Sequence, residues 1–157
     1  MQRRRWSRRT EVLKKHFEWS NTLKSLLGLK YSPVAVKFVK KDEQFKSNLI
    51  IDLNGKYRYC QMMMEAKNGK ICVLSSENIT CPAAAALGFK MLLEKIAQGT
   101  MLKTLGLFEK KEYGKMLMEK IPRLKANELK NFLALPLEKC NFTPELLIIE
   151  DTPEKIM

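Results

Sequence analysis

The spacing of apolar positions along the first two-thirds of the chain predicts three helices. Apolar residues recur every three or four positions over residues 10–27, which predicts an amphipathic helix that ends at Gly28. A second helix is predicted over residues 57–67. A third is predicted over residues 82–98, where a proline suits the first turn and four consecutive alanines favour helix.

The remaining segments predict more helix and several short strands. Residues 101–122 are mostly helical in character, with interruptions near Gly106 and Gly114, and residues 124–129 predict a further helical turn. Runs rich in aliphatic and β-branched residues predict strands at 33–39, 49–53, 71–75, 132–137 and 146–149. Helices and short strands therefore alternate through most of the chain, which favours a single domain of α/β or α+β architecture.

Composition narrows the class of protein. The 157 residues are 45% hydrophobic and 29% charged, which is typical of a globular protein with one buried core. No apolar run approaches the roughly 20 residues that a membrane-spanning helix needs, and the N-terminus lacks the apolar segment of a secretory signal. We therefore expect a cytoplasmic protein without a membrane span, whose four cysteines are reduced.

The positive charge is concentrated at the N-terminus. Residues 1–15 carry a net charge of +6, which is half of the net +12 of the whole chain. In the other residues, lysines interleave with glutamates, which is typical of a solvated surface. The arginine-rich arm could bind nucleic acid or anionic lipid through phosphates, although no known nucleic-acid-binding motif accompanies it.

Cys81 is the most distinctive position for chemistry, because it directly precedes the helix predicted at 82–98. The first amide N–H groups of a helix have no partners within the helix and present positive potential. A thiol in front of them is biased toward the thiolate, which binds metals and attacks electrophiles. The same potential suits a small anionic ligand, so a metal-free binding module is the alternative.

Cys60 is the second candidate, because a predicted helix and strand separate it from Cys81 and can return the chain to the same place. The spacing differs from that of zinc fingers and ferredoxins. Two thiolates still suit zinc or an iron–sulfur cluster when other residues complete three or four ligands. These ligands could come from a homo-oligomer, a partner subunit or a further C-terminal segment. Otherwise both cysteines are packing residues, as most free cysteines are.

The sequence leaves open whether the protein is an enzyme. Cys81 would be the nucleophile or the redox group of a catalytic site. His16 is the only histidine, so the chain contains no histidine-based triad, and His16 is assigned no role. The glycines form no phosphate-binding pattern, which argues against an ordinary nucleotide-binding enzyme.

Several blocks of the sequence resemble the domain of unknown function 169 family, whose biochemistry is unassigned and whose members occur mainly in archaea and anaerobic bacteria. The resemblance runs from about Trp19 to Met157. The blocks that carry it are Gly28 to Lys37, Cys60-Gln61, Glu77 to Pro82, Leu135-Pro136-Leu137, Phe142 to Ile148 and Thr152-Pro153-Glu154.

The resemblance implies that Cys60 and Cys81 are the two cysteine positions that recur in this region of the family. Cys72 and Cys140 match no such position, and we expect them to pack in the core. Family members usually continue beyond the equivalent of Met157, often with a further cysteine. Residues 152–154 also have the composition of a helix start. We therefore expect a domain that is truncated at its C-terminus.

These observations combine into one hypothesis. Residues 1–18 are expected to form a basic, partly helical extension, and residues 19–157 the N-terminal portion of the family domain. The expected function is metal or iron–sulfur binding through Cys60 and Cys81 in a cytoplasmic protein. The alternatives are binding of a small anionic ligand at the helix that follows Cys81, and nucleic-acid binding through the basic arm.

Overall fold

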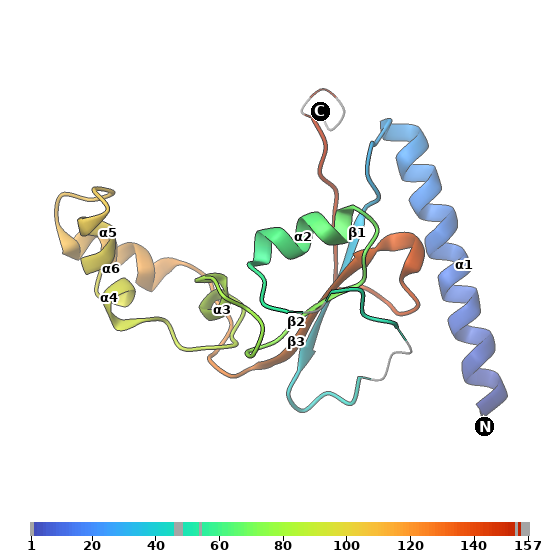
Figure 1. The fold of residues 1–157 in the computed structure, drawn as a ribbon, viewed down its shortest axis with the longest axis horizontal. Helices are drawn as coiled ribbons and strands as arrows, with labels where there is room; N and C mark the ends of the chain where they lie inside the picture. The colour runs from blue at the N-terminus through green and yellow to red at the C-terminus, as the bar shows by residue number, and fades with distance from the viewer. Residues whose placement is uncertain (1, 46–48, 54, 153, 155–157) are drawn as a thin grey trace.

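A four-stranded antiparallel sheet forms the centre of the computed structural model, which describes residues 2–45, 49–53, 55–152 and 154. Figure 1 shows the long helix α1 (Gln2–Leu27) at one end of the molecule and a group of short helices at the other. The helix α2 (Tyr59–Lys67) lies against the sheet between these two ends. The basic arm and the short helices are therefore far apart.

The sheet confirms an α+β architecture. Its strands, in the order β2-β3-β1-β4, are β1 (Val34–Lys40), β2 (Cys72–Leu74), β3 (Leu129–Pro136) and β4 (Leu146–Ile148). Val36 lies opposite Ala134 in the β1–β3 pair, and Ala35 lies opposite Leu147 in the β1–β4 pair. Every pairing is antiparallel, unlike the parallel sheet of an α/β fold. Four of the five predicted strands are confirmed to within a few residues.

The main core lies between the sheet and α2. Met62 and Ala66 are both 0% exposed and lie one helical turn apart, so they project from the same side of α2. They belong to one buried cluster with Leu74 of β2 and Phe132 of β3. The ring of Tyr59 meets that of Phe132 edge-on with centroids 5.6 Å apart, which holds the first turn of α2 against the sheet.

The second half of α1 attaches this helix to the fold. The helix predicted at 10–27 is confirmed and extends back to Gln2. His16 and Ser20, both buried, face the short helix η1 (Leu137–Lys139) and its flank. Nδ1 of His16 lies 2.8 Å from the carbonyl oxygen of Cys140. His16 therefore has a packing position, one turn before Ser20 on the same side of the helix.

The single helix predicted at 82–98 is wrong. The chain instead forms two short helices, α3 (Ala83–Ala86) and α4 (Glu94–Ala97), with an irregular segment between them. Gly88 has a φ of +69°, and a Cβ atom there would lie 2.6 Å from the carbonyl oxygen of Lys125. The chain at Lys125 packs closely against Gly88. This contact ends the helix that the four alanines would otherwise continue.

Three short helices form a helical lobe that projects from the sheet: α4, α5 (Thr100–Thr104) and α6 (Lys111–Lys120) (Figure 1). The interruption predicted at Gly106 is confirmed, because Gly106 lies between α5 and α6. The interruption predicted at Gly114 is wrong, because Gly114 lies inside α6. Its Cβ position would be 3.1 Å from Cα of Gly99, so close packing of two segments explains this glycine.

The strand predicted at 49–53 does not form. The amide of Asp52 donates to the carbonyl of Ile71 at 2.9 Å, and the amide of Ile71 donates to the Asp52 carboxylate at 2.8 Å. One backbone hydrogen bond and one hydrogen bond to a side chain therefore hold this segment. They replace the regular backbone hydrogen bonds that a strand would make.

The helical turn predicted at 124–129 is also wrong. Asn127 adopts a left-handed conformation with φ +62°, and β3 begins two residues later. The helix start predicted at 152–154 includes Pro153, which lies outside the described residues.

Candidate functional site

Cys81 lies at the N-terminus of a different helix from the one predicted. The helix that follows it, α3, has only one turn, so its own dipole is small. The Sγ atom of Cys81 instead accepts a hydrogen bond of 3.3 Å from the amide of Tyr59, the first residue of α2. The Gln61 side chain accepts a further bond from the amide of Arg58, the N-cap residue, at 3.0 Å. Cys81 is therefore one of the groups that satisfy the free amides of α2.

A rigid loop brings Cys81 to α2. The amide of Tyr57 donates to the carbonyl of Asn78 at 2.9 Å, and the amide of Thr80 donates to the carbonyl of Tyr57 at 3.0 Å. The Asn78 side chain accepts from the amide of Ser75 at 2.7 Å and donates to the carbonyl of Val73 at 2.9 Å. This single asparagine fixes the loop between β2 and Cys81 from both sides.

Cys60 lies at the same end of α2 as Cys81. It follows Tyr59 in the chain and is exposed. Because consecutive Cα atoms are about 3.8 Å apart, the Cα of Cys60 lies within about 9 Å of the Cys81 sulfur. Cys81 itself is partly buried. The structure thus places the two cysteines that the sequence singled out at the same end of α2.

The other two cysteines belong to the core, and both are 0% exposed. Burial, with the nearby Glu65 and Asp52 carboxylates, raises the pKa of the Cys72 thiol to about 12. Burial likewise raises the pKa of Cys140 to about 11, and its thiol donates to the Phe142 carbonyl at 3.0 Å. Neither thiol ionises near neutral pH, so both have packing positions.

The described part of the chain does not form a complete metal site. No group of three or more histidine, cysteine, aspartate or glutamate side chains converges among the described residues. Zinc sites and iron–sulfur clusters need three or four protein ligands. Cys60 and Cys81 can therefore provide two ligands at most, and any others must come from elsewhere.

A cavity of about 290 Å³ adjoins Cys81. Its walls are mostly apolar and come from the Cys81 turn, α3 and the start of the helical lobe; they include Thr80, Lys90, Met91, Leu93 and Ile96. The Lys90 ammonium forms no ion pair with any carboxylate in the described ranges. The site thus combines a thiol, an unpaired cation and an apolar wall.

Two features of this site are not predicted by the sequence. The first is the amide of Tyr59, whose partner is 22 residues away in the chain. The position of Cys60-Gln61 at a helix start was a usable signal, because Gln at the third helical position is typical of a capped N-terminus. The second is Lys90, which was placed inside a helix that does not form.

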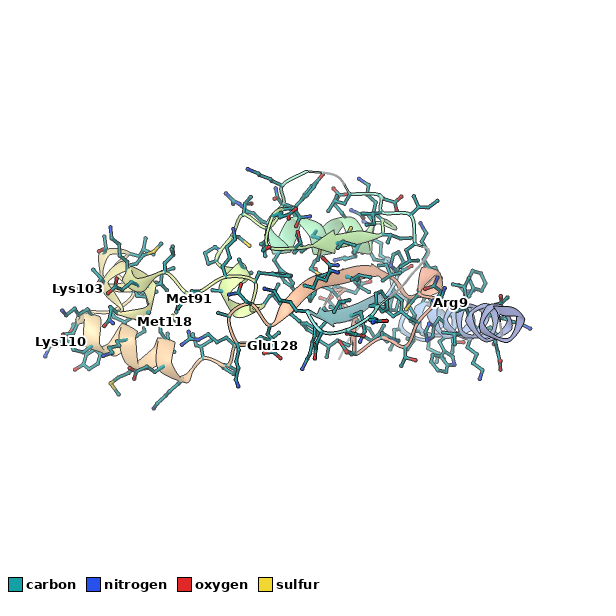
Figure 2. The ribbon with its side chains drawn as sticks, turned by 90° about the horizontal axis from the view of Figure 1, so that it is seen from below. Arg9, Met91, Lys103, Lys110, Met118 and Glu128 are labelled. Carbon is teal, nitrogen blue, oxygen red and sulfur yellow. The ribbon has the colours of Figure 1, made fainter. Side chains whose placement is uncertain are left out.

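The basic N-terminal segment is part of α1, and nucleic-acid binding by this segment stays a prediction. Figure 2 places Arg9 at the far end of the molecule from the helical lobe. Among the described residues, no helix has the length and apolar character required to cross a lipid bilayer.

Comparison with known proteins identifies a family. The profile of the uncharacterised ArCR family, DUF169, matches residues 22–157. Neither the curated proteins nor the solved structures contain a match to this chain. The profile covers β1 to β4, both candidate cysteines and the last six residues of α1. Because it matches most of the sequence, the chain belongs to the uncharacterised DUF169 family.

Proposed function

We propose that Cys60 and Cys81 supply two thiolate ligands for zinc or an iron–sulfur cluster, and that a second copy of this chain or a partner subunit supplies the others. The observation that carries the proposal is the hydrogen bond from the amide of Tyr59 to the sulfur of Cys81. It brings Cys81 to the helix end at which Cys60 lies.

The chemistry of the two sulfurs supports this choice of ligand. Thiolates select soft or borderline metals, such as zinc, and iron–sulfur clusters. Amide hydrogen bonds to cysteine sulfurs are among the features that tune such clusters. Cys60 is exposed, so a ligand from another chain has access to a metal beside it. The buried Cys72 and Cys140 offer no such access.

Metal analysis and visible absorption of protein purified without oxygen test the proposal. We expect stoichiometric zinc, or iron with a broad charge-transfer band, and loss of the metal in both Cys60→Ser and Cys81→Ser. Cys72→Ala is the matched control, because it removes a thiol from the core and should leave the metal in place. Wild-type protein without metal, or metal retained by both serine variants, would contradict the proposal.

A second candidate is binding of a small anionic ligand in the cavity beside Cys81, without a metal. The unpaired Lys90 at its wall favours this candidate. Titration with inorganic phosphate should then shift the NMR amide signals of Thr80, Cys81 and Lys90, and Lys90→Gln should weaken the effect. Equal shifts in Lys90→Gln would argue against it. Serine variants that lose metal but still bind phosphate would separate the two candidates.

A further inference from the structure

A different cavity, of about 580 Å³, opens where the helical lobe joins the sheet. Its volume lies within the range of small-molecule sites in proteins. Five segments converge on it: β1, the end of α3, residues 122–124, the start of β3 and the start of β4. The apolar part of its wall includes Phe38, Ala86, Leu87, Leu124, Leu129 and Leu146.

Two of the charged groups on the wall are already neutralised. The Glu128 carboxylate pairs with Lys40 at 3.2 Å and accepts a bond from the amide of Lys125 at 3.0 Å. The Glu145 carboxylate pairs with Lys37 at 2.7 Å and accepts a bond of 2.7 Å from the amide of Phe38. Neither carboxylate is free to attract a cationic ligand.

Arg123 is the exception among the charged residues of this wall. Within the described part of the chain, its guanidinium forms no hydrogen bond or ion pair. A guanidinium binds a carboxylate through two parallel hydrogen bonds, which makes it the group of choice for recognising that anion. The cavity therefore offers one unpaired cation at the edge of an apolar surface.

The walls of the cavity are fixed before any ligand binds. The amide of Leu124 donates to the carbonyl of Ala86 at 3.1 Å, which ties residues 122–124 to α3. Gly88 permits this contact, because a Cβ atom there would lie 2.9 Å from that of Leu124. On the opposite side, the amide of Glu145 donates to the carbonyl of Val36 at 2.9 Å. A preorganised wall reduces the entropic cost of binding.

We propose that this cavity binds a small monocarboxylate with an apolar body, its carboxylate on Arg123 and its body against the leucines and Phe38. A neutral ligand of the same shape gains no charged contact. A cationic ligand meets an unpaired guanidinium and two carboxylates that already have partners. The inference concerns a site separate from Cys60 and Cys81, and it does not depend on the function proposed for them.

Sodium octanoate is a suitable probe, with octan-1-ol and octylammonium chloride as its neutral and cationic counterparts. Titrations of the ¹⁵N-labelled full chain, followed by two-dimensional NMR, measure both location and affinity. We expect octanoate to give saturable shifts at the amides of Phe38, Leu87, Leu124 and Leu146. Octan-1-ol should bind more weakly and octylammonium most weakly.

Two variants and a matched control define the site. Arg123→Gln removes the cation and should weaken octanoate binding by about tenfold or more, because hydrogen bonds to charged groups are the stronger ones. Ala86→Trp fills the cavity from an exposed position and should abolish binding, with circular dichroism confirming the fold. Lys103→Gln removes a cation at the far end of the helical lobe, well away from Glu128 (Figure 2), and should leave binding unchanged.

The outcomes separate clearly. Shifts at the cavity amides that weaken in Arg123→Gln but not in Lys103→Gln support the site. Equal binding of octanoate and octylammonium, undiminished binding in Arg123→Gln, or shifts confined to the exposed face of α6 would each overturn it. Cys81→Ser should bind octanoate as the wild type does, whatever the result for metal.

Discussion

At the scale of single residues, Glu138 on η1 connects three parts of the chain. Its carboxylate accepts hydrogen bonds from Ser20 of α1 at 2.8 Å and from Ser32 before β1 at 2.5 Å, and Lys24 lies 3.9 Å away. Ser20 is 0% exposed, so its hydroxyl has no access to water as a replacement partner. Glu138 therefore contributes to stability through the groups that it satisfies.

We expect Glu138→Ala to lower the free energy of unfolding by about 1–3 kcal/mol, because the buried Ser20 hydroxyl is left without an acceptor. Urea denaturation followed by circular dichroism measures this change. Glu18→Ala is the matched control, since Glu18 is an exposed glutamate on α1, the helix that carries Ser20, and its loss should have almost no effect. Equal losses in the two variants would show that the effect of Glu138→Ala does not come from its hydrogen bond with Ser20.

The carboxylates of Glu138 and Glu145 also predict a pH dependence. Burial alone would raise the pKa of each, but hydrogen bonds outweigh it: Ser32 and Ser20 donate to Glu138, and Lys37 and the Phe38 amide donate to Glu145. The pKa of both groups is therefore lowered from the ordinary value of 4.5.

Because the folded state holds these groups ionised, their stabilisation is fully present above pH 4.5 and is lost as the pH falls through the lowered pKa values. The free energy of unfolding should thus decrease from about pH 6 to about pH 3. The double variant Glu138→Gln/Glu145→Gln should be less stable at the higher pH and should show a shallower decrease. An unchanged slope would assign the acid sensitivity to other groups.

The cysteines show what the sequence could and could not predict at this scale. The expectation that Cys60 and Cys81 converge rested on a helix and a strand returning the chain, and both elements form. The hydrogen bond from the amide of Tyr59 to Cys81 was not predictable, because it depends on the loop that Asn78 fixes. Hydrogen bonds between residues far apart in the chain leave no periodic signal in a sequence.

At the scale of elements, the helical lobe depends on the contact between Gly99 and α6. A Cβ atom on Gly99 would lie 2.0 Å from the carbonyl oxygen of Lys111 and 2.5 Å from the amide nitrogen of Lys115. Both are backbone atoms of α6, so they cannot move aside without displacing the helix. Gly99→Ala should therefore detach α6 from α4 and α5.

Gly106→Ala is the matched control for this substitution. Gly106 has a φ of +71°, close to the +73° of Gly99, but nothing lies within 4 Å of its Cβ position. In both variants, an alanine in the left-handed conformation costs about 1 kcal/mol. Only Gly99→Ala adds a clash with the backbone of α6. Limited proteolysis should cleave the lobe rapidly in Gly99→Ala and slowly in Gly106→Ala. Equal cleavage rates would mean that backbone strain, and not the contact between Gly99 and α6, determines the stability of the lobe.

The segment at 82–98 shows why element boundaries escaped prediction. Four alanines favour helix, and helix does form there, but only for one turn. Gly88 ends it because a distant segment packs on that residue. Propensity is a local property, whereas this packing requires the chain to return at residues 124–125. The strands at 33–39 and 132–137 were predictable because their apolar character reflects burial at the centre of the sheet.

At the scale of the whole molecule, burial is distributed unevenly. Both clusters of buried apolar residues centre on the sheet, α2 and η1, with further members from α3 and neighbouring loops, and neither includes a residue of the helical lobe. Within α4, α5 and α6, all of whose residues are described, Gly114 is the only buried one. Large apolar side chains such as Met116 of α6 and Leu105, which directly follows α5, are 52% and 60% exposed. The lobe thus gains little of the hydrophobic stabilisation that the sheet receives.

This difference predicts two levels of stability, which native-state hydrogen exchange measures. Amides of β1 and β3 should exchange only through global unfolding, whereas those of α5 and α6 should exchange through openings of lower free energy. As urea is added, the free energies of opening of the two sets should become equal only near the midpoint of unfolding. Gly99→Ala should speed exchange in the lobe alone, and Glu138→Ala should speed exchange in the strands, because it lowers the global stability that protects them.

If both sets exchange at one common free energy in the wild type, the lobe and the sheet unfold as a single unit. The exposed apolar residues of the lobe would then have to be stabilised by contacts other than those within this chain.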